Sequence, residues 1–109
     1  EHGDLEDLRS VLADDAVVWH NTDELLNDVD KTIRTLATIR GAARTLRYVD
    51  VSRAPTPTGF VQQHTLVVDM PDRSIRDLCC CIGWVENGRI TRIDAYHDSA
   101  ATGVMPHKT

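Results

Sequence analysis

Val17-Val18-Trp19-His20-Asn21 is the stretch that decides most about the fold, because it places an imidazole at the end of a run too apolar for a solvated loop. The run from Ala16 to Trp19 is β-branched or aromatic enough to predict a buried strand. Side chains alternate along a strand, so His20 shares its face with Ala16 and Val18. The histidine is either a core-edge residue bonded to a carbonyl group or a functional group, and this stretch leaves both interpretations open.

Two segments carry apolar side chains at helical spacing. The first follows Asp4, a capping residue, and ends at about Leu12. The second begins at the Asn27-Asp28 pair, covers residues 28 to about 40 and extends at most to Ala43. Acidic side chains lie in the first turn of each, where the helix dipole favours them. The sequence therefore predicts a short helix before the first strand and a longer helix after it.

From Leu46 onward the apolar pattern has a period of two, which indicates strands. Asn87-Gly88 lies between two such runs and predicts a type I′ hairpin, because that turn needs positive φ at both central residues. We expect an α+β fold in which a four-stranded antiparallel meander curls around the helices and leaves a pocket in its concave face. The predicted strands are Leu46–Arg53, Gly59–Met70, Ile75–Val85 and Arg89–His97.

Composition and charge exclude several classes of protein. A chain of 109 residues without an internal repeat predicts a single domain, residues 1–109. The formal charge of −5 and the scattered arginines argue against a nucleic-acid partner, and the apolar runs are too short to cross a membrane. Cys79, Cys80 and Cys81 are consecutive and lack zinc-binding spacing, so they indicate strand residues of a protein in a reducing compartment, the cytoplasm.

His64 lies in the middle of a predicted strand and shares its face with Phe60, Gln62 and Leu66. A histidine and a glutamine among apolar neighbours either satisfy each other inside a small core or face a pocket. The pocket is the favoured interpretation, because burying two polar groups without a function costs free energy.

His97 ends an apolar row on the last predicted strand, after Ile93 and Ala95, where a solvated strand tip is the alternative to a pocket group. Four side chains are of the metal-ligand type: His20, Asp23, His64 and His97. The sequence has no His-x-His or His-x-x-x-His spacing, no nucleophile elbow around a serine and no glycine-rich phosphate loop. We therefore expect neither a metal nor a cofactor.

Residues 13–21 have the sequence Ala-Asp-Asp-Ala-Val-Val-Trp-His-Asn, residues 59–64 have Gly-Phe-Val-Gln-Gln-His, and residues 87–98 have Asn-Gly-Arg-Ile-Thr-Arg-Ile-Asp-Ala-Tyr-His-Asp. Together they resemble the SnoaL-like branch of the nuclear transport factor 2-like superfamily, over nearly the whole chain. The resemblance implies a cone-shaped, strongly curved sheet wrapped around helices, with a deep apolar cavity and usually a dimer through the outer sheet face. It also implies a longer first helix ahead of Gly3, in keeping with the helix-end character of Glu1-His2-Gly3.

The superfamily contains ketosteroid isomerases, polyketide cyclases, limonene epoxide hydrolases, scytalone dehydratases and proteins without catalysis. Similarity to the isomerases implies that His20 stands at their catalytic aspartate base, while their tyrosine and protonated aspartate have no clear equivalents. Similarity to the epoxide hydrolases implies Val18 at a tyrosine and His20 at a water-positioning asparagine. Their catalytic aspartate falls on Ala95, which argues against that mechanism. His20 and His64 resemble in type the two histidines of the dehydratases.

We expect a protein that binds a small apolar or aromatic molecule and acts as an acid-base isomerase, cyclase or dehydratase. A buried imidazole stays neutral and is a competent base, so His20 would take a proton, His64 would donate to the developing oxyanion, and Asp23 would orient His20. The alternative is a ligand-binding or dimerisation module without turnover, and a carboxylate bound to either imidazole would distinguish the enzyme from it. The residues expected to line the ligand site are Val18, Asn21, Phe60, Gln62, Ala95 and His97.

Two expectations concern the faces of the sheet. His20 and His64 should face one cavity, with their rings within roughly 10 Å of each other, a span that a single-ring ligand can bridge. The opposite face should form a homodimer, because exposed apolar side chains in one patch need a partner. The side chains expected on that face include Val17, Trp19, Val61, Thr65 and Val67.

Overall fold

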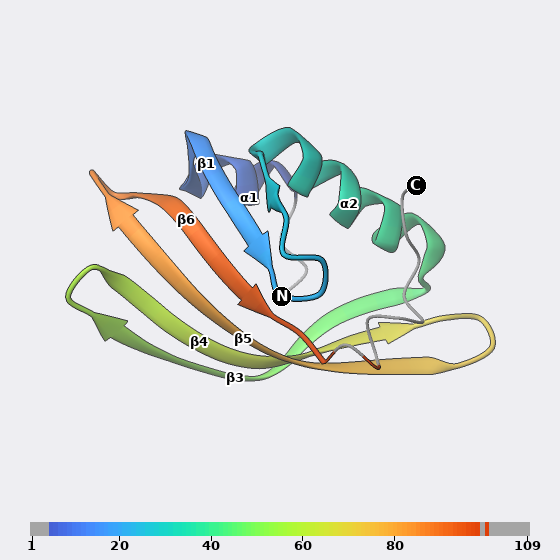
Figure 1. Ribbon diagram of the computed structural model, residues 1–109. Helices are drawn as coiled ribbons and strands as arrows, with labels where there is room; N and C mark the ends of the chain where they lie inside the picture. Colours follow the sequence, from blue (N-terminus) through green and yellow to red (C-terminus); the bar gives the residue numbers. More distant parts are fainter. Residues whose placement is uncertain (1–4, 99, 101–109) are drawn as a thin grey trace.

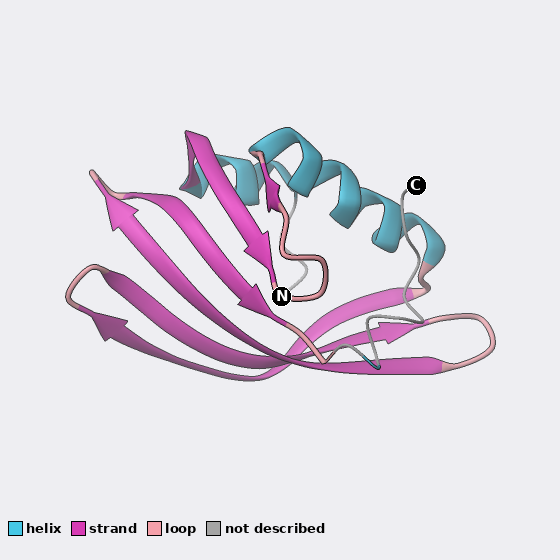
Figure 2. Cartoon of the chain, viewed as in Figure 1, coloured by secondary structure: helices cyan, strands magenta, loops and turns pink. Residues whose placement is uncertain are grey.

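The computed structural model describes residues 5–98 and residue 100. Along these residues the elements are α1 (Leu5–Val11), β1 (Leu12–His20), β2 (Leu26–Asn27), α2 (Val29–Ala42), β3 (Thr45–Thr56), β4 (Gly59–Asp69), β5 (Ser74–Glu86) and β6 (Arg89–Tyr96). The strands form one curved sheet in the order β2-β1-β6-β5-β4-β3, with both helices over the same face (Figure 1; Figure 2). Neither helix is long and apolar enough to cross a membrane. The α+β class is confirmed.

The four strands from β3 to β6 are antiparallel to their neighbours, which confirms the predicted meander. Asn87 and Gly88 have φ values of 52° and 78°, so both central residues of the last hairpin adopt the positive φ that its sequence predicts. β1 pairs with β6 in the parallel direction and brings the first strand next to the last. The sheet is therefore antiparallel except at this pairing.

α2 begins after Asp28, whose carboxylate accepts a hydrogen bond from Lys31 N at 2.8 Å, and it ends within the predicted range. The predicted cap of the first helix, Asp4, lies outside the described residues. α1 ends at Val11 because Leu12 already belongs to β1, where only 1% of it is exposed. The segment between β1 and α2 contains the two-residue strand β2, which pairs with β1.

Two apolar clusters hold the helices on the sheet. The first joins β1, α2 and β6 and contains Leu12, Ala16, Val29, Ile33, Ile90 and Ile93. The second joins α2 to β3, β4 and β5 and contains Ile39, Leu46, Leu66, Val68, Ile75 and Cys79. Because α2 contributes Ile33 to one cluster and Ile39 to the other, it is fixed across the sheet at two points.

A bulge in β3 moves the side chains of the second half of that strand to the opposite face of the sheet. The register with β4 shifts between Val49 and Ser52, and Asp50 inside the bulge has a φ of 54°. One extra residue in a strand reverses the face of every side chain that follows it. The bulge thereby pairs Arg53 with Gln62 on the helix-covered face of the sheet.

Candidate functional site

A row of paired residues crosses five strands on the helix-covered face, and three of its members, His20, Gln62 and Arg53, have polar side chains. In register across β1, β6, β5, β4 and β3, the members of this row are His20, Ala95, Cys81, Gln62 and Arg53. Strand alternation predicted the face of His20, Ala95 and Gln62. Segments far apart in the sequence therefore meet on one surface.

Two further histidines lie beside this row. His97 follows β6, and its ring stacks on that of His20 with 5.3 Å between centroids and 26° between planes. His64 lies on β4 and pairs with Cys79 of β5. Its ring packs against that of Tyr48, with 4.8 Å between the ring centroids. The strand order β1, β6, β5, β4 places His97 between His20 and His64. We call His20, His64, His97 and Asp77 the histidine cluster.

Asp77 is the buried carboxylate that holds His97. Its side chain is 2% exposed, its Oδ2 lies 2.8 Å from His97 Nδ1, and its Oδ1 accepts a hydrogen bond from Asp98 N at 2.9 Å. Burial by itself would raise the pKa of Asp77, but the hydrogen bonds from His97 and Asp98 N hold that pKa below its ordinary value. An ionised carboxylate only accepts, so His97 carries a proton on Nδ1.

The other ring nitrogen of His97, Nε2, is buried and has no hydrogen-bond partner among the described residues. Oδ1 of Asn27 is in the same situation. Buried polar atoms are usually hydrogen-bonded, and an unpaired one costs free energy. A ligand with a hydroxyl group or an acidic proton would supply the missing donor.

Amide side chains, not carboxylates, contact the two flanking imidazoles. Asn27 Nδ2 lies 3.2 Å from His20 Nδ1, and Gln62 Nε2 lies 3.0 Å from His64 Nδ1. Burial is the main cause that lowers the pKa of both histidines below 6.5, and the neighbouring charge of His97 adds to it. Both rings are therefore neutral at pH values near 7.

The structure places two of the predicted site residues in supporting positions. Asp23 accepts a hydrogen bond from Leu25 N at 3.0 Å and closes an exposed turn, so Asn27 occupies the hydrogen-bonding position beside His20 that was expected for Asp23. The charge of Asp23 only opposes the lowering of the pKa of His20. Asn21 uses its amide twice on the backbone of His97, accepting from N at 2.8 Å and donating to O at 3.2 Å. It clamps His97 to the end of β1.

The apolar residues of the predicted site lie on the expected face. Val18 and Ala95 are buried, at 6% and 5% exposure. The ring of Phe60 lies over Gly83, where an added Cβ atom would come within 2.2 Å of it. Contact of these three side chains with a ligand stays a prediction.

Asp77, Cys79 and His97 bring an oxygen, a sulfur and a nitrogen atom within 4.8 Å of one another, a donor set that zinc could use. These atoms are instead joined by hydrogen bonds, since His97 Nδ1 lies 2.8 Å from the carboxylate and 3.3 Å from the sulfur. Burial and the nearby Asp77 raise the pKa of the Cys79 thiol far above its ordinary value, which disfavours the thiolate that a metal needs.

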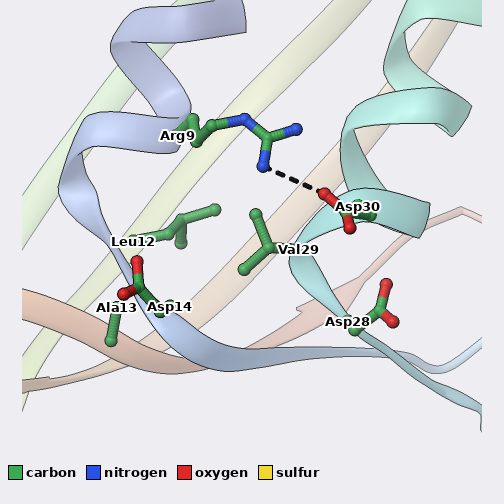
Figure 3. A pocket seen from close by; sticks show the side chains of 7 residues that line it. All are labelled: Arg9, Leu12, Ala13, Asp14, Asp28, Val29 and Asp30. Atoms are coloured by element: carbon green, nitrogen blue, oxygen red, sulfur yellow. Dashed lines mark hydrogen bonds and ion pairs between the residues drawn. The ribbon is translucent and has the colours of Figure 1, made fainter.

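Two surface hollows lie away from the histidine cluster. The larger, of about 300 Å³, sits where α1, β1 and the start of α2 meet, and Arg9 reaches across it to Asp30 at 3.0 Å (Figure 3). The other, of about 260 Å³, lies between the end of α2 and β3. No histidine lines either hollow, so the predicted apolar cavity stays an expectation.

Sequence reasoning missed Asp77, Asn27 and Arg53. Asp77 left a signal, because it interrupts the inward row of Ile75 and Cys79 with a charge. Asn27 was interpreted as part of a helix cap, and a two-residue strand gives no periodicity that would show otherwise. Arg53 reaches this face only through the bulge.

The arrangement of a curved sheet around helices is that of nuclear transport factor 2-like proteins, and comparison with solved structures confirms this fold. A protein of this class and of unknown function from Burkholderia pseudomallei superposes with a TM-score of 0.78 at 18% identity, over 94% of this chain and 85% of that one. A putative SnoaL-like polyketide cyclase from Jannaschia gives 0.75 at 11% identity, over 94% and 77%. IdmH, a putative polyketide cyclase from Streptomyces antibioticus, gives 0.64 at 19% identity, over 94% and 88%.

No family model matches the sequence, and neither does any curated protein. At these identities the structural similarity establishes the cone fold and leaves activity open. The histidine cluster is therefore the feature of this chain that bears on its function.

Proposed function

We propose that the protein binds a small apolar or aromatic molecule between its helices and sheet and catalyses a proton transfer on it, as an isomerase, cyclase or dehydratase does. The observation that carries this proposal is the 2.8 Å contact between buried Asp77 and His97 Nδ1, which leaves Nε2 as the acceptor nitrogen, without a partner among residues 5–98. A base held in one tautomer by a carboxylate is typical of catalytic sites. The free thiols favour a cytoplasmic location.

His97, flanked by His20 and His64, is the base in this proposal, in place of the His20 expected from the sequence. Its Nε2 takes a proton from an acidic carbon or hydroxyl of the substrate, and the resulting imidazolium is stabilised by the ionised Asp77. The electron pair left on the substrate moves to an oxygen, which His64 stabilises by donating a hydrogen bond. The proton returns from His97 to another atom of the substrate, so the protein ends the cycle unchanged.

The second candidate is a ligand-binding module without turnover. It is favoured by the amides that hold His20 and His64, because a carboxylate on one of these rings was the feature expected of an enzyme. In this case the imidazoles only anchor polar atoms of the ligand.

A generic carbon acid separates the two candidates. Removal of the ring C–H proton of 5-nitrobenzisoxazole breaks its N–O bond and releases a coloured cyanophenolate, so a buried base accelerates the reaction without a dedicated substrate. We expect His97→Ala and Asp77→Asn each to lower the second-order rate constant about 100-fold. Asp14→Asn, which changes an exposed carboxylate on β1, is the matched control. Binding of the probe without acceleration supports the module, and a wild-type rate for His97→Ala contradicts His97 as the base.

A further inference from the structure

Arg53 stands at the end of a chain of side chains that leads to His64. It follows the bulge of β3, which runs beside β4 in the sheet (Figure 1). Its Nε donates a hydrogen bond to Gln62 Oε1 at 2.8 Å, and Gln62 Nε2 lies 3.0 Å from His64 Nδ1. The chain is therefore guanidinium to amide to imidazole, with one defined contact at each step.

The first step fixes the orientation of the amide. Arginine has donors and no acceptor, so the atom of Gln62 that faces Arg53 has to be the carbonyl oxygen. The NH₂ group of Gln62 then faces His64 and can only donate. Nδ1 of His64 is consequently an acceptor without a proton, and in the neutral ring the proton lies on Nε2.

His97 is held as the opposite tautomer. Its Nδ1 faces the ionised carboxylate of Asp77, which only accepts, so its proton lies on Nδ1. In their neutral forms, the rings of His64 and His97 thus differ in the atom that carries the proton. His64 offers a hydrogen-bond donor at Nε2, and His97 offers a lone pair at its own Nε2.

We propose that Arg53 is a positioning residue that acts through Gln62 to hold His64 as the Nε2–H tautomer, so that His64 donates a hydrogen bond where His97 accepts a proton. The ligand suited to this pair has an acidic C–H or O–H for His97 and an acceptor oxygen for His64. The tautomer assignment stands on geometry alone, whereas its use in proton transfer rests on the proposed function.

The charge of Arg53 also favours the neutral form of His64. Burial is the main cause that lowers the pKa of His64, the charges of His97 and Arg53 lower it further, and the charge of Asp77 opposes them. His64 is therefore kept as a neutral donor and does not compete with His97 for the proton. Arg53 can do this only because the bulge at Asp50 turns it toward the helix-covered face.

The test reads tautomers directly, by long-range ¹H–¹⁵N correlation of the histidine rings at about pH 8, above the ordinary pKa of a free imidazole. We expect Nε2–H for His64 and Nδ1–H for His97 in the wild-type protein. Gln62→Glu replaces the donor by an acceptor and should convert His64 to Nδ1–H. Arg53→Met frees the amide to rotate and should give a mixture of tautomers, while Arg53→Lys, which keeps a donor, should restore Nε2–H.

Arg76→Met is the matched control, because Arg76 is an exposed arginine of β5 on the opposite face of the sheet from Asp77. It should leave both tautomers unchanged. Nδ1–H on wild-type His64, or an unchanged His64 in both Gln62→Glu and Arg53→Met, overturns the proposal. If Gln62→Glu does not fold, Arg53→Met and its lysine rescue decide alone.

Turnover of 5-nitrobenzisoxazole by the same variants separates this proposal from the proposed function. A loss of about tenfold in Arg53→Met, restored by Arg53→Lys, supports both, since a single donor to a developing anion contributes at least that factor. The expected tautomers together with a rate that His97→Ala does not change leave the positioning role intact and reject the proposed base.

Discussion

At the scale of single residues, the histidine cluster makes the protein sensitive to mild acid. His20 and His64 have a pKa below 6.5 in the folded protein, chiefly because they are buried, and regain the ordinary value when the chain unfolds. As the pH falls through about 6.5, the unfolded chain takes up protons that the folded chain does not, so the free energy of unfolding decreases. The decrease ends below the folded-state pKa values.

A prediction follows for the pH dependence of stability in the double variant that carries His20→Gln and His64→Gln. Urea denaturation of the wild-type protein should show a free energy of unfolding that falls between about pH 7.5 and pH 5, by at most about 1.4 kcal/mol per pH unit for each histidine. In the double variant the fall should be clearly smaller. Asp77, whose pKa is also lowered, titrates in a separate and more acidic range and leaves this window unaffected. Equal pH dependence in the two proteins would contradict the assignment of this fall to His20 and His64.

The residue scale also shows why the site was only partly predictable. Strand alternation identifies the face of a side chain, so the sequence places His20, Gln62, His64 and His97 on one surface. It does not identify contacts between strands, because these depend on register. The two-residue Asn87-Gly88 turn sets the register of β5 and β6 only as far as the pair Val85 and Ile90, because the register then shifts by one residue. The contact of Asp77 with His97 depends on that shift, which the sequence does not reveal.

At the scale of elements, the hairpin of β4 and β5 depends on two glycines in close contact. An added Cβ at Gly59 would lie 2.0 Å from the carbonyl oxygen of Gly83, which belongs to the backbone and cannot rotate away. We expect Gly59→Ala to lower the free energy of unfolding by about 2 kcal/mol, because one strand has to shift. Chemical denaturation measures this loss.

Gly41→Ala is the matched control for that substitution. Gly41 lies in α2, and nothing is within 4 Å of the position where its Cβ would be. Alanine is the better helix former, so the variant should gain about 0.5 to 1 kcal/mol. Equal effects of the two substitutions would show that the Gly59 contact is relaxed in solution.

The elements that the sequence predicted well are those with long periodic patterns. α2 and the four strands of the meander end within a few residues of their predicted bounds. The bulge of β3 was missed because Val49, Asp50 and Val51 alternate as in a regular strand, and the adjacent apolar pair Tyr48-Val49, where the phase of the pattern changes, lies before the bulge. Only the register with β4 reveals the extra residue, and register is a property of two strands rather than one.

At the scale of the whole molecule, the sheet has two faces of different character. The helix-covered face carries the histidine cluster, and the opposite face exposes apolar side chains of β5 and β6. Leu78, Ile82 and Tyr96 are 64%, 36% and 42% exposed, and the ring of Tyr96 contacts Trp19 edge-on at 5.3 Å. Thr65 and Val67, which the pattern also assigns to this face, are buried.

This outer face leads us to propose a homodimer, with Leu78 as the most exposed side chain of the patch. Apolar patches of this kind on a sheet are usually covered by a partner, and a twofold axis covers two at once. A charge placed in the middle of such an interface meets its own copy across the axis. Leu78→Lys should therefore give a monomer where the wild-type chain is a dimer, as sedimentation equilibrium at micromolar concentration would show.

Leu25→Lys supplies the comparison that makes this result specific. Leu25 is 52% exposed in the loop before β2, so the substitution adds the same charge to a similarly exposed leucine outside the β5 and β6 patch. It should leave the dimer intact. Since the histidine cluster lies on the other face, Leu78→Lys should also keep the histidine tautomers of the wild-type protein, because dimerisation and the site use opposite sides of one sheet. A wild-type chain that sediments as a monomer at this concentration would contradict the outer-face dimer.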